Sequence, residues 1–129
     1  MAKIESFEDL EVWTKARGLC KRIFDIRNES NLKTDYRLYD QINAASGSIM
    51  DNIAEGFERN GNKEFIQFLS IAKASCGEVR SQLYRIRDRN YISSEVFEEL
   101  LEEVRSLSRQ IGGFITYLQK SDYKGTKFK

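Results

Sequence analysis

The sequence predicts an all-α protein, an antiparallel four-helix bundle with up-down-up-down topology, on three observations. No proline occurs in the 129 residues, and proline is the residue that most strongly breaks a helix interior. Four long segments carry apolar residues at steps of three and four, the spacing of an amphipathic helix. Short breaks rich in Asn, Ser and Gly separate these segments, so each helix must double back along its neighbour. We therefore expect a single domain over residues 1–121, with room for one continuous core.

The first two helices are predicted over about 7–27 and 35–59. The sequence Ser6-Phe7-Glu8-Asp9 is typical of a capping box, and its acidic residues favour the positive end of a helix dipole. Asn60-Gly61 ends the second segment. That segment carries one apolar stripe: Leu38, Ile42, Ala45, Ile49 and Ile53.

The last two helices are predicted over about 62–89 and 94–120. The third has the alternating four-and-three spacing of a heptad seam, which indicates coiled-coil-like packing: Phe65, Leu69, Ala72, Cys76, Val79, Leu83 and Ile86. Ser93 or Ser94 caps the fourth, and acidic residues follow in its early turns. Residues 122–129 are polar and basic without periodicity, so we expect a flexible tail there.

Composition argues against catalysis. The chain has no histidine, which removes the usual general base and a common metal ligand. Cys20 and Cys76 lack CxxC spacing and lie in apolar helical segments, so we interpret both as buried, reduced thiols. We expect no enzyme activity, no metal or other cofactor and no small-molecule substrate.

Charge and hydropathy indicate the location. Lys plus Arg number 21 and Asp plus Glu number 20, so net charge alone attracts neither nucleic acid nor an anionic membrane. The first residues lack the apolar run of a signal peptide, and no run of about 18 apolar residues occurs. We expect a cytoplasmic protein with no membrane partner.

The first two helices have more apolar surface than one core requires. Apolar positions cover roughly 200° of the first helix at about 100° per residue, whereas a core-facing stripe needs little more than about 100°. Either long polar neighbours cover the excess, or it forms a subunit interface, which we prefer. The interface candidates are Val12, Leu19, Ile26, Tyr39, Met50 and Phe57.

Glycines lie inside the predicted helices, where each costs roughly 0.5–1 kcal/mol relative to alanine. Close approach of neighbouring backbones is the explanation we favour, with a ligand site as the alternative. The positions are Gly18, Gly47, Gly77, Gly112 and Gly113.

Basic residues gather late in the third helix and in the tail. The candidates for nucleic-acid binding are Arg80, Arg85, Arg87, Arg89, Lys124, Lys127 and Lys129. Cations near a helix C-terminus also favour the dipole, and charged faces are often only solvated. Yet Tyr84 and Tyr91 lie among the arginines, an arrangement that lets bases stack while cations hold phosphates.

The stretch Gln41-Ile42-Asn43-Ala44-Ala45-Ser46-Gly47-Ser48-Ile49, then Asn52-Ile53-Ala54-Glu55-Gly56 and Arg59, resembles the central motif of a bacterial family. Its members are four-helix-bundle proteins encoded in intervening sequences of 23S ribosomal RNA genes. The resemblance continues through Glu78 and Gln82-Leu83, with one departure at Asn43, where the family often has arginine. The resemblance implies a left-handed bundle, a homopentamer, and a role linked to ribosomal RNA or the ribosome. A similar bundle is the accessory protein of diversity-generating retroelements, which binds nucleic acid and a reverse transcriptase.

Within that motif, Asn52, Glu55 and Arg59 lie at i, i+3 and i+7 on one helix face, and Glu55 with Arg59 has the spacing of an ion pair. These residues offer no nucleophile or tuned base, so we interpret them as structural or as part of an interface. The sequence thus favours a non-enzymatic oligomeric module that binds RNA or associates with ribosomes. The alternative is a homo-oligomeric scaffold or accessory protein that binds proteins without contacting nucleic acid.

Overall fold

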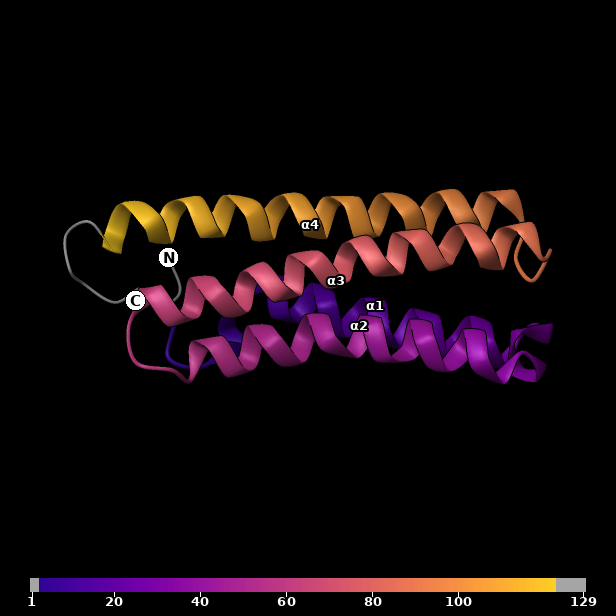
Figure 1. Ribbon diagram of the computed structural model, residues 1–129, viewed down its shortest axis with the longest axis horizontal. Coiled ribbons are helices and arrows are strands. Elements are labelled where there is room, and N and C mark those ends of the chain that lie inside the picture. The colour runs from indigo at the N-terminus through magenta and orange to yellow at the C-terminus, as the bar shows by residue number, and fades with distance from the viewer. Residues whose placement is uncertain (1–2, 123–129) are drawn as a thin grey trace.

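The computed structural model describes residues 3–122 and contains four long helices in this range, with no strand. They are α1 (Glu11–Asn28), α2 (Tyr36–Phe57), α3 (Asn62–Asp88) and α4 (Ser94–Asp122). Two short 3-10 helices, η1 (Phe7–Asp9) and η2 (Asn31–Thr34), precede α1 and α2. Successive helices run in opposite directions, and each packs on two others in the cyclic order α1, α2, α3, α4 (Figure 1). The fold is the antiparallel up-down-up-down four-helix bundle that the sequence predicts.

The helix starts follow local capping chemistry. The predicted first helix divides at Leu10, whose backbone is extended, so that η1 and α1 are separate. The Asp9 carboxylate accepts hydrogen bonds from the amides of Glu5 (2.9 Å) and Ser6 (3.2 Å), and these bonds lower its pKa. At the start of α4 the Ser93 hydroxyl accepts from the amide of Val96 (3.1 Å), which identifies Ser93 as the cap.

The helix ends differ modestly from the sequence prediction. Helix α2 ends at Phe57 and not at Arg59, and Gly61, with a φ of 93°, is the last residue of the turn and the N-cap of α3. Helix α4 continues through Asp122, so the predicted tail begins inside this helix. The rest of that tail lies outside the described residues.

The core is the stripe that the periodicity predicts. Every residue of the α3 heptad seam, from Phe65 to Ile86, has no exposed surface. The predicted stripe of α2 is also buried, and Phe97, Leu100, Leu101, Val104, Leu107, Ile111 and Leu118 of α4 complete the core. Edge-to-face contacts join the Phe65 ring to Phe57 (5.9 Å) and Phe114 (5.3 Å) at one end of the bundle.

The interior glycines do not share one explanation. A Cβ added at Gly18, Gly47, Gly77 or Gly113 would meet nothing within 4 Å. For these four positions, the expected close approach inside one chain is wrong. Gly56 is the tight position, because an added Cβ would lie 2.7 Å from the Phe68 Cβ.

Candidate functional site

The arginines at the end of α3 divide between two faces of the helix. Arg85 and Arg89, one turn apart, face α2. An Arg85 guanidinium nitrogen donates to the Gln41 side-chain oxygen (2.9 Å), and Arg89 pairs with the Asp35 carboxylate (2.7 Å). Both arginines are therefore engaged with α2 and its N-terminal cap.

Asp35 is the centre of a polar cluster at this end of the bundle. Its carboxylate caps α2 through the amide of Leu38 (3.3 Å), and it accepts from the Tyr91 hydroxyl (2.8 Å). The Tyr91 hydrogen bond and the Arg89 guanidinium lower the pKa of Asp35, while the same Asp35 hydrogen bond raises the pKa of Tyr91. Through these hydrogen bonds the α3–α4 connection contacts the start of α2.

Arg80, Tyr84 and Arg87 form a second face, directed toward α4, which we name the Arg–Tyr surface. The Tyr84 ring packs edge-on against Phe97 (5.0 Å between centroids) and remains 43% exposed. The Arg87 guanidinium lies over the same Phe97 ring at 5.0 Å. Neither Arg80 nor Arg87 has an acidic partner among residues 3–122, and the Nε of Arg80 is buried without a hydrogen bond there. The Arg–Tyr surface thus combines two guanidinium groups that have no acidic partner among residues 3–122 with an exposed tyrosine ring.

The other basic candidates, Lys124, Lys127 and Lys129, lie outside the described residues.

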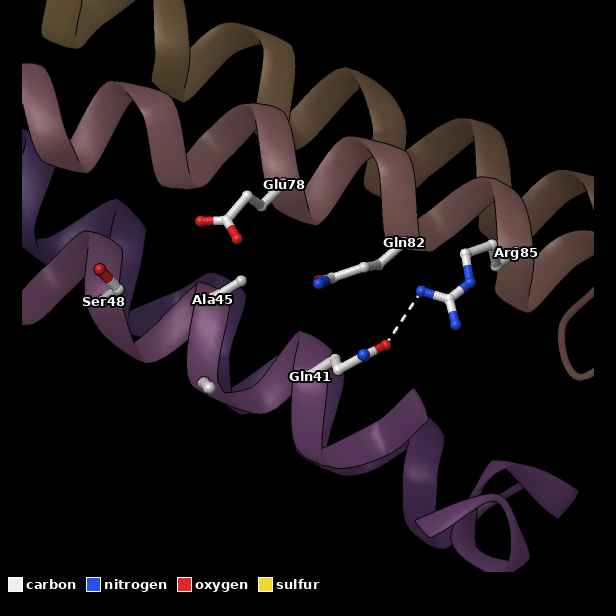
Figure 2. A pocket seen from close by; sticks show the side chains of 7 residues that line it. Gln41, Ala45, Ser48, Glu78, Gln82 and Arg85 are labelled. Atoms are coloured by element: carbon white, nitrogen blue, oxygen red, sulfur yellow. Dashed lines mark hydrogen bonds between the residues drawn. The ribbon is translucent and has the colours of Figure 1, made fainter. Parts of the chain in front are cut away.

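A polar groove with a volume of about 360 Å³ lies between α2 and α3 (Figure 2). Gln41, Ala44, Ala45 and Ser48 of α2 and Glu78, Gln82 and Arg85 of α3 line it. Two predicted motif residues, Gln41 of α2 and Glu78 of α3, therefore line the same groove from different helices. Gln82 and Ser48 also line the groove, although they are not among the predicted site residues. Polar side chains beside the core stripe of both helices, at steps of three and four, were the signal for them.

The remaining motif residues continue along the same helix pair. Asn52 donates to the Ser48 carbonyl (2.8 Å) and hydroxyl (2.9 Å), and Ser75 of α3 donates to that hydroxyl (2.9 Å). The predicted Glu55–Arg59 ion pair is present (2.7 Å), although both side chains are about half exposed, so it adds little stability. Gly56 is buried against Phe65 and Phe68. The Ser75–Ser48 hydrogen bond and the contacts of Gly56 with Phe65 and Phe68 join α2 to α3.

Part of the predicted interface belongs to the core of one chain. Val12, Leu19 and Ile26 are 6%, 0% and 8% exposed, so their assignment as interface residues is wrong. Helix α1 packs on α2 and α4 and also contacts both 3-10 helices, which widens its buried arc beyond one stripe. The other three candidates remain partly exposed at the edge of the core: Tyr39, Met50 and Phe57.

Phe24, which was not among the candidates, is half exposed on α1. On the neighbouring turn, the Arg27 guanidinium lies 4.9 Å from the centroid of the Tyr39 ring of α2. The outer face of α1 and α2 therefore retains apolar surface after the core is filled.

The two thiols differ. Cys76 is buried, and desolvation raises its pKa to about 11. Cys20 is only partly buried, with a pKa raised chiefly by desolvation. Within the described part of the chain, no three His, Cys, Asp or Glu side chains are placed to hold a metal ion, and no helix is long and apolar enough to cross a membrane.

The protein is thus a four-helix bundle in which the motif residues from Gln41 to Arg59, together with Glu78, lie along the α2–α3 pair. Residues 8–113 match the family of 23S rRNA-intervening sequence proteins, and the chain belongs to this family. A crystal structure of a Bacteroides thetaiotaomicron protein of unknown function, from the S23 ribosomal protein family, is similar in fold. Its TM-score is 0.75 and its identity 23%, over 81% of this chain and 95% of that chain. No curated protein sequence matches.

Proposed function

We propose that this chain is a non-enzymatic, oligomeric protein of the cytoplasm that binds RNA, with ribosomal RNA as the first target to test. The observation that carries the proposal is the Arg–Tyr surface: two arginines without acidic partners among residues 3–122 flank a tyrosine that is 43% exposed. Guanidinium groups hold phosphates, and an exposed ring stacks an unpaired base. Membership of a family named for 23S rRNA intervening sequences supports the choice of RNA.

Oligomerisation would strengthen this binding. Phe24, Tyr39, Met50 and Phe57 leave apolar surface on the outer face of α1 and α2, and a second copy of the chain would cover it. Gly47, one turn before Met50, has open space around it, so its cost to the helix has no explanation within one chain. Repetition of the Arg–Tyr surface around a ring, a pentamer by resemblance, would convert weak contacts into avidity.

The test measures affinity for a structured 23S rRNA fragment and an unrelated RNA at several salt concentrations. The Arg80→Gln, Arg87→Gln variant removes the two cations and keeps good helix formers. Each lost phosphate contact should reduce the slope of log affinity against log salt by roughly 0.7–0.9, or about five- to eightfold in affinity at about 0.1 M salt.

The matched control is Lys15→Gln, Lys21→Gln on α1, which changes the net charge equally at residues whose ion pairs are solvent-exposed. Its RNA affinity should stay near that of the wild type. An equal loss of RNA affinity in both variants would show that binding depends on net charge alone and not on the Arg–Tyr surface. An absence of RNA binding at low salt would refute the proposal and favour the scaffold that contacts only proteins.

A further inference from the structure

The outer face of α1 exposes an apolar ring and a cation two helical turns apart. Phe24 is 50% exposed. Arg17, seven residues earlier, is also exposed; its guanidinium lies 5.8 Å from the centroid of the Trp13 ring and forms no ion pair within residues 3–122. Residues seven apart share a helix face and are separated by about 10.5 Å at 1.5 Å per residue. The face therefore presents an apolar group and a positive charge at a fixed separation.

One face of α3 exposes the complementary pair at the same separation. Ile71 is 49% exposed, and Glu78, seven residues later, is exposed without an ion pair or hydrogen bond within residues 3–122. Figure 2 shows the Glu78 carboxylate extending toward the Ser48 end of the α2–α3 groove and away from Arg85. Between the two residues, Ala74 is exposed and small, so a second helix can approach this face closely.

The other exposed apolar side chains of the described residues lack this pattern. Tyr84 lies among the cations of the Arg–Tyr surface, and like charges there would repel Arg17. Tyr36 and Tyr117 have neutral amide side chains at the seven-residue spacing on their helices. The face of α3 that carries Ile71 is therefore the best match for the α1 face in both charge and spacing.

Two alignments would bring Phe24 onto Ile71. An antiparallel alignment places Arg17 against Glu78, and a parallel one places it against Glu64, seven residues before Ile71. Glu64 lies in the first turn of α3, where its charge already offsets the helix dipole. Glu78 has no such role, and the groove beside it, with a volume of about 360 Å³, has room for a guanidinium group. These differences favour the antiparallel alignment.

We propose that α1 of one copy of this chain docks antiparallel on α3 of a second copy, with Arg17 paired to Glu78 and Phe24 packed on Ile71. The inference rests on the oligomer in the proposed function and names the surfaces that join its copies. Because these two surfaces differ, each copy carries one of each, and the contact can repeat around a closed ring. The Arg–Tyr surface is directed toward α4, away from the α2–α3 groove, so every copy in the ring keeps it free for RNA.

The test exchanges the two charges and measures oligomer mass by light scattering over a range of protomer concentrations. Arg17→Glu and Glu78→Arg each place like charges at the contact, and each should weaken association by roughly 10- to 100-fold. The variant with both substitutions restores opposite charges and should recover most of the loss. Ile71→Ser should also weaken association. Circular dichroism should show unchanged helicity in all four variants, because the replaced side chains are exposed.

Lys15→Glu is the matched control, because it makes the same charge change on α1. Lys15 is two residues from Arg17 and therefore lies on the opposite side of the helix at about 100° per residue, and its ion pair with Glu11 is solvent-exposed. This variant should associate like the wild type, and the same substitution should not rescue Glu78→Arg.

If the wild type is oligomeric but the charge exchange restores nothing, the contact is overturned while the proposed oligomer stands. Recovery in Arg17→Glu, Glu64→Arg in place of the Glu78 exchange would overturn the antiparallel pairing. A wild type that is monomeric at micromolar concentration would refute both the contact and the oligomer, whereas salt-dependent RNA binding by that monomer would still support the RNA-binding part of the proposed function.

Discussion

Gly56 is the position where one added methyl group should have the largest effect on the bundle. An alanine Cβ there would lie 2.7 Å from the Phe68 Cβ, 2.9 Å from a Phe65 ring carbon and 3.3 Å from the Phe65 carbonyl oxygen. Two of these atoms belong to or adjoin the α3 backbone and cannot rotate away. Because Phe65 is fully buried, Gly56→Ala must push α2 and α3 apart or displace that ring.

Gly77→Ala provides the matched control, because an added Cβ at Gly77 meets nothing within 4 Å. Both substitutions gain up to about 1 kcal/mol of helix stability. Overpacking costs typically about 1–3 kcal/mol, so Gly56→Ala should be less stable than Gly77→Ala by roughly that amount. In a domain of this size the thermal unfolding midpoints of the two variants should differ by roughly 3–15 °C.

The assay is thermal and urea unfolding followed by circular dichroism at one protomer concentration, since association shifts apparent stability. Gly77→Ala should equal or exceed the wild type, and Gly56→Ala should fall below it. Equal midpoints for the two variants would refute the reasoning, because they would show that the helix pair relaxes around the methyl group without cost.

Three other results are expected. Asp35→Asn should destabilise the protein at pH 7. The Tyr91 hydrogen bond and Arg89 lower the pKa of Asp35 in the folded state. The stabilisation by the ionised carboxylate is therefore present above the ordinary pKa near 3.8 and is lost as the pH falls from there through the lowered folded-state pKa. In urea unfolding, the difference in unfolding free energy between wild type and Asp35→Asn should be smaller at pH 3 than at pH 7. An equal difference at both pH values would contradict this expectation. Iodoacetamide at pH 8 should modify Cys20 before Cys76, whose pKa of about 11 suppresses the reactive thiolate, and peptide mass spectrometry showing the reverse order would contradict the burial argument. Phe24→Ser should preserve helicity and reduce oligomer mass in light scattering, whereas a monomeric wild type would refute the oligomer proposal.

The helices and the core could be predicted from the sequence because they depend on local periodicity. The seam from Phe65 to Ile86 is buried throughout, as its heptad spacing requires. The break at Leu10 was missed, since one extended residue leaves the apolar pattern almost unchanged. The misassignment of Leu19 has a different cause, because the width of a buried arc depends on how many neighbours pack around a helix.

The candidate site was only partly accessible from the sequence. The arginines of α3 and the motif residues could be identified. The helix face that each arginine occupies could not, because it follows from side chains on other segments of the chain. Arg85 bonds to Gln41 and Arg89 to Asp35, residues far away in the sequence. The groove likewise exists only where α2 and α3 meet, so its unpartnered Gln82 oxygen could not be recognised from periodicity.

The most direct test of the central claim locates bound RNA on the protein. RNA containing 4-thiouridine would be crosslinked to the wild-type protein by ultraviolet light, and the attached peptides identified by mass spectrometry. Crosslinks should concentrate on the part of α3 that carries Tyr84 and Arg87 and decrease with added salt. Crosslinks confined to the outer face of α1 and α2, or none at low salt, would contradict RNA binding at the Arg–Tyr surface.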